Sequence, residues 1–406
     1  MDNFSKNSFF NNKVIAVFLA ILTLIFVVND YANETIDSIA VVVGIGVDQT
    51  DDGKYQVSCE VLTPADDSSS GSGNKDVVLT GFGGTIAEGI DDVFKRIGWY
   101  PKLNYCNVLI LSKDVAKAGA IDALSYFLKT EKIMDSALIV VSENKAIEIL
   151  EAATPLDNVS SQAVQKIAMQ KYKHGANIIE INLKDFMKNF YDEGVNDILT
   201  VVKTDNAVGH QSEEDKQKIK KKNMEVFDLT SSAIFYQGKL VGEINADLTN
   251  AYVLAKDNAK DSTLIVKDVS SPYINGGKNV DVTLDIIKHK NDIAVSLENG
   301  KPKIKISVEM EVQFNDASKR EGFMTFSLVN QVPLEVITKA TDTLKFDLME
   351  LFEISRKTKS DIFAVGNSLS KYNNKKWREY LLTKADSSDY LNDTKIEVDV
   401  KIKSVK

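Results

Sequence analysis

Two stretches of strictly alternating apolar and polar residues constrain the fold of this chain more than any other feature. Apolar side chains occupy every second position in Ile304–Phe314 and again in Ile396–Ile402. Side chains alternate between the two faces of a β-strand, so each stretch predicts a strand with one buried and one solvent-facing side. Between them, Pro333 is predicted to start an amphipathic helix with an apolar stripe along Val336–Leu351. The C-terminal part is therefore predicted to be an antiparallel sheet packed against one long helix.

The preceding part of the chain alternates between strand-like and helix-like segments. The apolar runs Ile39–Val47 and Tyr55–Leu62 predict a hairpin with Gly53 in its turn. Thr85 and Glu88 have the spacing of a capping box and predict a helix start. Further strands are predicted at Tyr105–Leu111 and Ser136–Val141, and further helices at 113–129, 143–153, 160–173 and 183–192. This alternation is typical of an α/β domain.

A charged stretch separates the two parts. Residues 206–222 hold almost no apolar side chains, which indicates a linker or an exposed loop. Strands are predicted after it at Ser232–Tyr236 and Lys239–Gly242, with a turn at Gln237–Gly238, and a short helix follows at Leu248–Leu254. These segments form either a small unit of their own or a unit that shares its core with the C-terminal part.

The predicted fold class is α+β, or mixed α/β, in an elongated body of several domains. A chain of 406 residues is long enough for two or three domains that each bury a core. The predicted divisions are a cytoplasmic tip with a transmembrane anchor at 1–33, an α/β domain at 34–205, a charged linker at 206–222, a small strand-rich middle domain at 223–262 and an α+β domain at 263–406.

The N-terminal apolar run predicts a membrane anchor. Val14–Val28 reads VIAVFLAILTLIFVV, and Lys13 precedes it while Asp30 follows it. Positive charge before the run and negative charge after it orient the N-terminus toward the cytoplasm and the body outside. Fifteen residues of helix rise about 22 Å, less than the ~30 Å hydrocarbon core. Lys13 and Tyr31 at the two interfaces can cover the shortfall.

Two other interpretations of this run remain open. The run has nearly the length of a cleaved signal peptide, but cleavage after Ala32 would place Asp30 at the −3 position, where a small residue is required. A buried core helix is disfavoured by the uniform apolarity and the terminal position of the run. The uncleaved transmembrane helix is the favoured interpretation.

Composition and cysteine content exclude several classes of function. The net charge is −9 and the acidic excess is dispersed, which argues against a nucleic-acid-binding protein. Cys59 and Cys106 lie in or beside apolar strand-like runs and are predicted to be buried free thiols. A disulfide between them stays possible, although an exported protein of this size does not need one.

No motif in the sequence predicts catalysis, a cofactor or a metal site. His174, His210 and His289 are scattered without a metal-ligand spacing and are predicted to be solvated. Gly44 and Gly46 begin a glycine pattern that lacks the third glycine and the following helix of a dinucleotide site. The glycine run at 81–84 lacks the lysine of a P-loop and predicts a tight turn from strand to helix. The chain is therefore predicted to be non-enzymatic, with no catalytic, cofactor-binding or metal-ligating residue.

Several segments carry a resemblance to a known family. The first two are Gly44-Ile-Gly-Val-Asp48 with Glu60-Val-Leu-Thr-Pro64, and Gly84-Thr-Ile-Ala-Glu88 leading to Asn104-Tyr-Cys-Asn-Val-Leu-Ile-Leu111 and then to Asp114, Ala116 and Gly119. The last two are Ser232-Ala-Ile-Phe-Tyr-Gln-Gly-Lys-Leu-Val-Gly242, and Asp361-Ile-Phe-Ala-Val-Gly366 followed by Trp377 and the strand Val398–Lys403. In this order, across residues 36–406, they resemble the Ger(x)C family, the C subunit of GerA-type spore germinant receptors.

The resemblance implies a location, partners and a role. A Ger(x)C protein is expected on the outer face of the spore inner membrane, with integral membrane A and B subunits as partners. Its expected role is scaffolding or coupling of nutrient sensing to germination, without catalysis or cofactors. The family usually carries a lipidated cysteine after its signal sequence. No cysteine precedes Cys59 here, so no lipidation is predicted, and the apolar helix would replace the lipid as the tether.

Two other functions remain open. A membrane-tethered extracytoplasmic substrate-binding protein would show strand–helix alternation in both halves, whereas the second half has the pattern of an antiparallel sheet. An exported enzyme acting on cell wall or peptide would need a polar constellation that the sequence does not show. Trp99 and Trp377 are residue types common in partner contacts, but buried packing explains each as well. No binding residue is predicted.

Overall fold

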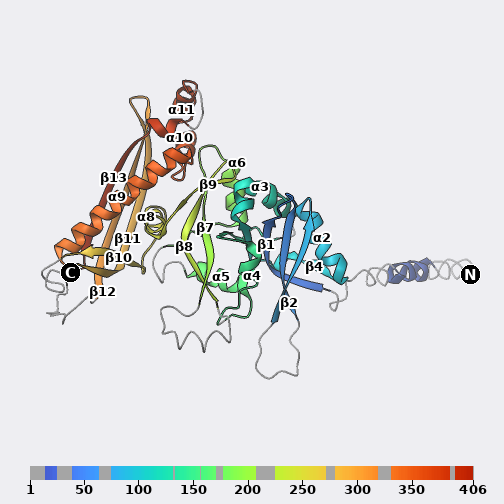
Figure 1. Ribbon diagram of the computed structural model, residues 1–406. Coiled ribbons are helices and arrows are strands. Elements are labelled where there is room, and N and C mark those ends of the chain that lie inside the picture. The colour runs from blue at the N-terminus through green and yellow to red at the C-terminus, as the bar shows by residue number, and fades with distance from the viewer. Residues whose placement is uncertain are drawn as a thin grey trace, which may run out of the picture.

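The computed structural model describes residues 14–24, 39–63, 75–130, 133–155, 157–170, 177–206, 225–270, 279–318, 331–384 and 389–405. Two β-sheets lie side by side in it (Figure 1). Helix α8 (Ala246–Lys256) connects them, because it packs against β8 (Glu225–Tyr236) of the first sheet and against β11 (Val280–Glu298) of the second.

The first sheet is mixed, with the strand order β3-β2-β1-β5-β6-β7-β8-β9. Its strands other than β8 are β1 (Ile39–Gln49), β2 (Tyr55–Thr63), β3 (Lys75–Gly83), β5 (Val108–Ser112), β6 (Leu138–Ser142), β7 (Ile198–Asn206) and β9 (Lys239–Ile244). The short strand β4 (Tyr100–Lys102) pairs with the start of β1. The central strands β1, β5, β6 and β7 are parallel, and antiparallel strands flank them at both ends.

Helices cover both faces of the first sheet, as the α/β prediction requires. One face packs against α2 (Ile86–Ile97), α3 (Lys113–Thr130) and α6 (Leu183–Tyr191), and the other against α4 (Ala146–Leu150) and α5 (Ser160–Met169). In β5, Leu109 and Leu111 belong to the first core and Val108 and Ile110 to the second. A strand buried on both faces therefore has a continuous apolar sequence.

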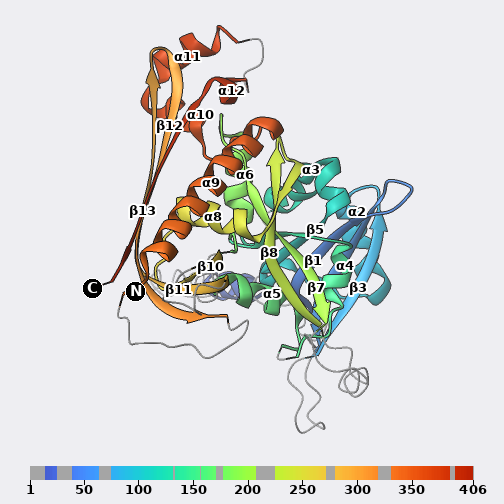
Figure 2. The same cartoon turned by 60° about the vertical axis from the view of Figure 1, so that its left-hand side comes forward.

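The second sheet has the order β10-β11-β12-β13, with β10 (Thr263–Val269), β12 (Lys301–Ala317) and β13 (Lys395–Ser404) beside β11. Helix α9 (Leu334–Thr358) covers one face, and Val336, Leu344 and Leu348 lie in the shared core. Figure 2 shows α9 running along this sheet. The short helices α10 (Val365–Tyr372), α11 (Asn374–Leu381) and α12 (Tyr390–Asp393) follow. The predicted sheet and its long helix are confirmed.

The prediction that this sheet is wholly antiparallel is wrong. The pairs β10–β11 and β11–β12 are antiparallel. Strand β13 runs parallel to β12, with Ile304 opposite Ile396 and Met310 opposite Ile402. A parallel neighbour requires a long connection that returns the chain to the same end of the sheet. Helix α9, with 25 residues, supplies most of that return.

Local turn and cap chemistry agrees with the sequence. The Thr85 hydroxyl accepts a hydrogen bond from the Glu88 backbone N–H, and Glu88 Oε2 accepts one from the Gly84 N–H at 2.7 Å. The hairpin between β8 and β9 turns through Gln237 and Gly238, both with positive φ. Two-residue hairpin turns with positive φ match the twist of the flanking strands.

The described part of segment 223–262 contributes strands to the first sheet and a helix to the core of the second. Its strands β8 and β9 extend the first sheet beside β7, and its helix α8 belongs to the core beneath the second sheet. The division of the chain into domains stays a prediction. The proposed linker lies outside the described residues except for Asn206, the last residue of β7.

The N-terminal apolar run is described only in part. Residues 14–24 are helical and every side chain among them is exposed, including Phe18 and Leu24 at 65% and 66%. Residues 25–28, the end of the predicted anchor, lie outside the described part. Among the described residues, no helix has both the length and the apolarity needed to cross a membrane.

Candidate functional site

The part of the chain built on the first sheet meets the part built on the second where the connection from α6 to β7 contacts the first turn of α10 and the connection that precedes it. The backbone at Gly194 approaches that of Gly366 so closely that a Cβ on Gly194 would lie 2.5 Å from the Gly366 Cα. The Asn367 N–H donates to the Gly194 carbonyl at 2.9 Å. Only glycine at both positions permits this approach, because any side chain would separate the two segments.

Hydrogen bonds tie the same two segments together. The Asn196 side-chain oxygen accepts from the Asp361 N–H at 2.9 Å, and the Asn196 N–H donates to the Asp361 carbonyl at 3.0 Å. The Ser360 hydroxyl donates to the carbonyl of Phe235, the penultimate residue of β8, at 2.6 Å. We call this contact, formed by residues 194–197, 235–238 and 359–367 with Tyr390, the junction.

The buried carboxylate of Asp361 is the centre of the junction. Its oxygens accept from the Val365 N–H at 3.0 Å, the Gly366 N–H at 2.8 Å and the Tyr390 hydroxyl at 2.6 Å. Asp361 is 1% exposed, and this burial raises the pKa of its carboxyl although the three donors oppose the effect. The carboxylate caps the start of α10 and holds α12 beside it through Tyr390.

Two further buried carboxyl groups cap helices within the first part. Asp48, at the end of β1, accepts from the Ala146 and Ile147 N–H groups of α4 at 2.7 and 3.1 Å. Glu60 in β2 accepts from the Ser160 N–H of α5 at 2.7 Å. Burial raises the pKa of Glu60 to about 8. A carboxyl group on a buried strand thus satisfies N–H groups that a helix start leaves unpaired.

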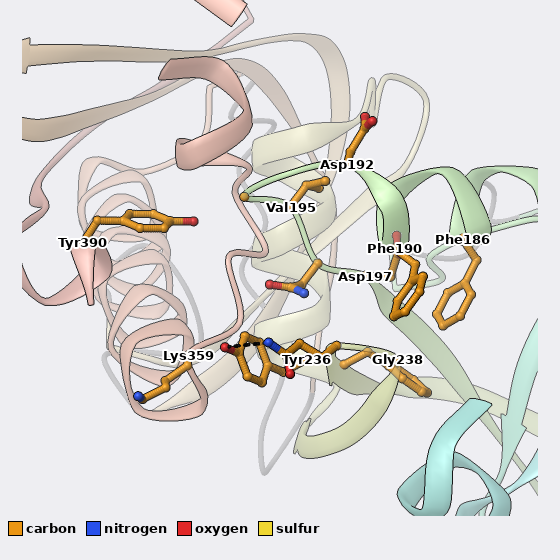
Figure 3. Close-up of a pocket in the computed structure, with 13 residues that line it drawn as sticks. Phe186, Phe190, Asp192, Val195, Asp197, Tyr236, Gly238, Lys359 and Tyr390 are labelled. Atoms are coloured by element: carbon orange, nitrogen blue, oxygen red, sulfur yellow. Dashed lines mark hydrogen bonds between the residues drawn. The ribbon is translucent and has the colours of Figure 1, made fainter. Parts of the chain in front are cut away.

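A cavity of about 470 Å³ opens beside the junction (Figure 3). Phe186 and Phe190 of α6 line one side, and Lys359 and Tyr390 line the other. Asp197 lies between them, 6% exposed, and accepts from the Asn189 side-chain amide at 2.7 Å. Burial raises the pKa of Asp197 to about 7, so its charge changes near neutral pH.

The described residues do not assemble a metal site, since no group of three potential ligands occurs among them. His174 and His210 lie outside the described part. The prediction that His289 is solvated is wrong, because its Nε2 is buried without a hydrogen-bond partner among the described residues. Its Nδ1 accepts from the Ala259 N–H at 3.4 Å, and burial lowers the pKa of the ring.

The cysteines and the glycine run have structural roles. Cys59 and Cys106 are buried and free, which confirms the predicted thiols, and burial raises the pKa of Cys59 to about 12. A thiol with so high a pKa is unreactive at neutral pH. Gly81 lets α2 pack directly on β3, because a Cβ there would lie 2.2 Å from the Gly89 carbonyl oxygen. Ahead of α2, the Gly84 N–H already donates to Glu88 Oε2.

The two tryptophans lie in different surroundings. Trp377 is 2% exposed, stacks on Tyr380 with ring centroids 5.5 Å apart, and meets the Tyr390 ring edge-on at 5.0 Å. Trp99 is 36% exposed and precedes β4. Buried packing therefore explains Trp377 and not Trp99.

The family-like segments of the sequence contain Asp361 of the junction and the helix-capping residues Asp48 and Glu60 of the first part. The sequence predicts no role for any of the three. The sequence feature that indicates a buried carboxyl group is an acidic residue inside or beside an apolar run. Such a side chain is costly to bury unless it is paired. Asp197 and the Gly194–Gly366 approach had no such signal, because they depend on contacts between distant parts of the chain.

Comparisons with known proteins then identify the family. The family model described as "Spore germination protein N-terminal domain" matches residues 32–204, and the one described as "Spore germination B3/ GerAC like, C-terminal" matches residues 230–405. The chain belongs to the Ger(x)C family of spore germination proteins. Strand β8, which begins at Glu225, therefore straddles the start of the C-terminal family segment and joins it to the first sheet.

Relatives of this Ger(x)C protein agree with that assignment. It is 21% identical to Spore germination protein KC of Bacillus subtilis (strain 168) over 398 residues, which cover 95% of this chain and 94% of the relative. It is 22% identical to Spore germination protein B3 of the same organism over 294 residues, which cover 71% of each chain. The crystal structure of the GerBC protein has the same fold, with a TM-score of 0.51 at 16% identity over 89% of this chain and 97% of that one.

Proposed function

We propose that this Ger(x)C protein is the non-catalytic C subunit of a spore germinant receptor. Its role is to couple nutrient sensing by integral membrane A and B subunits to the start of germination. The observation that carries this proposal is the match of both family models, in order, along 32–204 and 230–405. Relatives named as spore germination proteins cover 95% and 71% of the chain.

The junction supports a scaffolding role. Its polar groups bond to one another and to backbone, as Asp361 does with Gly366 and Tyr390. A catalytic site instead needs a nucleophile or base aimed at a substrate. Strands β8 and β9 join the first sheet while α8 joins the core of the second, so this segment and the junction together hold the two parts of the chain against each other.

The same proposal includes a tether and a location. Residues 14–24 form a helix whose apolar side chains are exposed and have no cover from the rest of the described chain. An exposed apolar helix of this kind is stable when a bilayer surrounds it. We place the apolar run in the spore inner membrane, crossing once, with the body on the outer face.

Co-purification tests the receptor role. The full chain with a C-terminal affinity tag should retain multi-spanning membrane subunits when it is isolated from detergent-solubilised spore membranes. A Gly194→Ala variant, which separates the junction, should retain them less well, and Gly300→Ala is its matched control. Recovery of the tagged chain alone under conditions that keep other membrane complexes intact would contradict the proposal.

Alkaline extraction followed by mass spectrometry tests the tether. We expect the chain to stay with the membrane pellet and to begin within the first few residues of the sequence. A mature chain that begins near residue 33 and appears in the soluble fraction would overturn this part of the proposal.

The cavity at Asp197 favours a second candidate, a membrane-tethered substrate-binding protein. Such a protein would bind an amino acid or a sugar tightly without partner subunits. The second sheet weighs against it, because β10, β11 and β12 form an antiparallel meander and only β13 is parallel to a neighbour. Isothermal titration of the purified full chain with amino acids and sugars separates the candidates, and the receptor-subunit proposal predicts no tight binding.

A further inference from the structure

The end of the first sheet where β1 begins carries exposed aromatic side chains close together in the sequence. Trp99, Tyr100 and Tyr105 are 36%, 56% and 54% exposed, and Ile97 beside them is 38% exposed. We call these four residues the aromatic rim. Ile97 ends α2, Trp99 precedes β4, Tyr100 begins β4, and Tyr105 ends the short 3-10 helix ahead of β5. Singly exposed apolar residues need no explanation, but several together at one edge indicate a contact surface.

The strand order places the rim where the chain enters the body. Strand β4 pairs in parallel with the first residues of β1, with Tyr100 opposite Ile39 and Pro101 opposite Ala40. Ile39 is the first described residue after the helix at 14–24. The rim therefore lies at the end of the body that the N-terminal segment reaches first, far from the second sheet (Figure 1).

Chain length keeps this edge close to any membrane that holds the N-terminal helix. The apolar run ends at Val28, about eleven residues before Ile39, and eleven residues span at most ~40 Å when fully extended. The body cannot move farther than that from the bilayer. Within that distance, one side of the body faces the lipid headgroups. The aromatic rim is adjacent to Ile39, where the chain enters the body.

The residue types in the rim suit a membrane interface better than a second protein. Tryptophan and tyrosine combine an apolar ring with a polar group, and both are enriched at the depth of the headgroups. Charge does not carry the argument, because Arg96 is paired with Asp92 and Lys95 lies 4.0 Å from Asp91. The aromatic rim would contact the membrane interface through its rings and not through charged side chains.

We propose that the aromatic rim rests in the headgroup layer of the bilayer that holds the N-terminal helix. The rim would then orient the body over the membrane and present the junction and the second sheet away from it. This inference rests on the proposed membrane tether and goes beyond it, since a tether alone leaves the body free to rotate.

The two tryptophans make the inference testable by fluorescence. The full chain is reconstituted into phosphatidylcholine–phosphatidylglycerol vesicles, with and without lipids brominated near the headgroup, which quench nearby tryptophan. We expect brominated lipid to quench the wild type, and Trp99→Phe to remove the larger part of that quenching. The remaining emission comes from Trp377, which is 2% exposed inside the body.

A matched control places a tryptophan elsewhere on the surface. Tyr372 in α10 is 83% exposed and belongs to the second part of the chain. In the Trp99→Phe background, Tyr372→Trp restores an exposed indole that lies away from the rim. We expect its fractional quenching to be at most half that of the wild type. Unfolding midpoints of both variants should match the wild type, since both positions are exposed.

Flotation of the vesicles separates failure of the tether from failure of the rim. A chain that floats with vesicles, but whose Trp99 emission is quenched no more than that of the Tyr372→Trp control, keeps its tether and overturns the rim. The rim would then face a protein partner or solvent. A chain that does not float overturns both the tether and the inference that rests on it.

Discussion

The junction and the aromatic rim are built by opposite rules. At the junction, a carboxyl group that is 1% exposed accepts three hydrogen bonds, so the chain itself satisfies the buried polar group. At the rim, Tyr100 and Tyr105 leave more than half of their surface uncovered. The comparison shows that the polar groups of the junction find their partners within the chain, whereas the rings of the aromatic rim are left accessible to a membrane or to solvent.

This contrast separates two kinds of effect. A buried polar group without a partner destabilises the fold, so changes at the junction should lower the free energy of unfolding. An exposed ring contributes little to that free energy, so changes at the rim should affect membrane contact and not folding. The predictions below test this separation, beginning with the largest expected effect.

Trp377→Ala should have the largest effect on stability. The indole is 2% exposed and contacts the rings of Tyr380 and Tyr390, and its removal leaves a cavity beside the junction. We expect the free energy of unfolding to fall by about 3–5 kcal/mol. Urea denaturation followed by circular dichroism measures it, and a loss below about 1 kcal/mol would show that the junction is loosely packed.

Asp361→Ala should lower the free energy of unfolding by about 3 kcal/mol. The reason is that the Val365 and Gly366 N–H groups and the Tyr390 hydroxyl lose their common acceptor. Tyr390→Phe is the matched control, since it removes one donor and leaves the two backbone bonds. It should cost about 1 kcal/mol. Equal losses in the two variants would mean that the carboxylate does not cap α10, and chemical denaturation distinguishes these outcomes.

Gly194→Ala should lower the free energy of unfolding by about 2–3 kcal/mol through overpacking. The added Cβ would lie 2.5 Å from the Gly366 Cα. Gly300→Ala in the β11–β12 turn is the control, with φ +77 against +67 at Gly194 and no atom within 4 Å of the added Cβ. Gly300→Ala should lower the free energy of unfolding by only about 1 kcal/mol, through backbone strain. The difference between the two thermal unfolding midpoints then isolates the close approach of the two segments.

Asp197→Asn should change how stability depends on pH. The pKa of Asp197 is raised to about 7 by burial, and the nearby Asp185 raises it further while Lys256 opposes it. Between pH 4 and 7 the unfolded carboxyl is ionised and the folded one is protonated, so unfolding releases a proton. The free energy of unfolding of the wild type should therefore fall by about 2 kcal/mol relative to that of Asp197→Asn between pH 5 and 7. Urea midpoints that shift in parallel for both proteins would contradict the raised pKa.

Much of the fold was predictable because it depends on local patterns. The alternation at Ile304–Phe314, the capping box at Thr85 and the turn at Gln237–Gly238 each require only neighbouring residues, and the structure contains all three. The direction of β13 was not predictable, because alternation shows which side of a strand is buried and not the strand's orientation. That orientation follows from the path of α9.

The buried carboxyl groups, Asp361 at the junction and Asp48 and Glu60 in the first part, are predictable only as residues without roles. An acidic residue in an apolar segment, such as Glu60, indicates a buried partner without identifying it. The partners Ser160 and Ser161 are 100 or more positions away in the chain. His289 shows the same limit, because lysines on either side suggested solvent while the fold buries its Nε2. Exposure of Trp99 likewise depends on how β4 is placed against β1.

Trp99→Ala should have the smallest effect on folding and is the sharpest test of the contrast. Trp99 and Trp377 are the same residue type, so an identical substitution removes the same atoms from the rim and from the junction. We expect Trp99→Ala to lower the free energy of unfolding by about 1 kcal/mol, well below the loss in Trp377→Ala, because 36% of the Trp99 surface is already exposed. Urea denaturation of the full chain in detergent measures this. A loss comparable to that of Trp377→Ala would mean that the rim is part of the core, and its exposed rings would then give no reason to place it against a membrane.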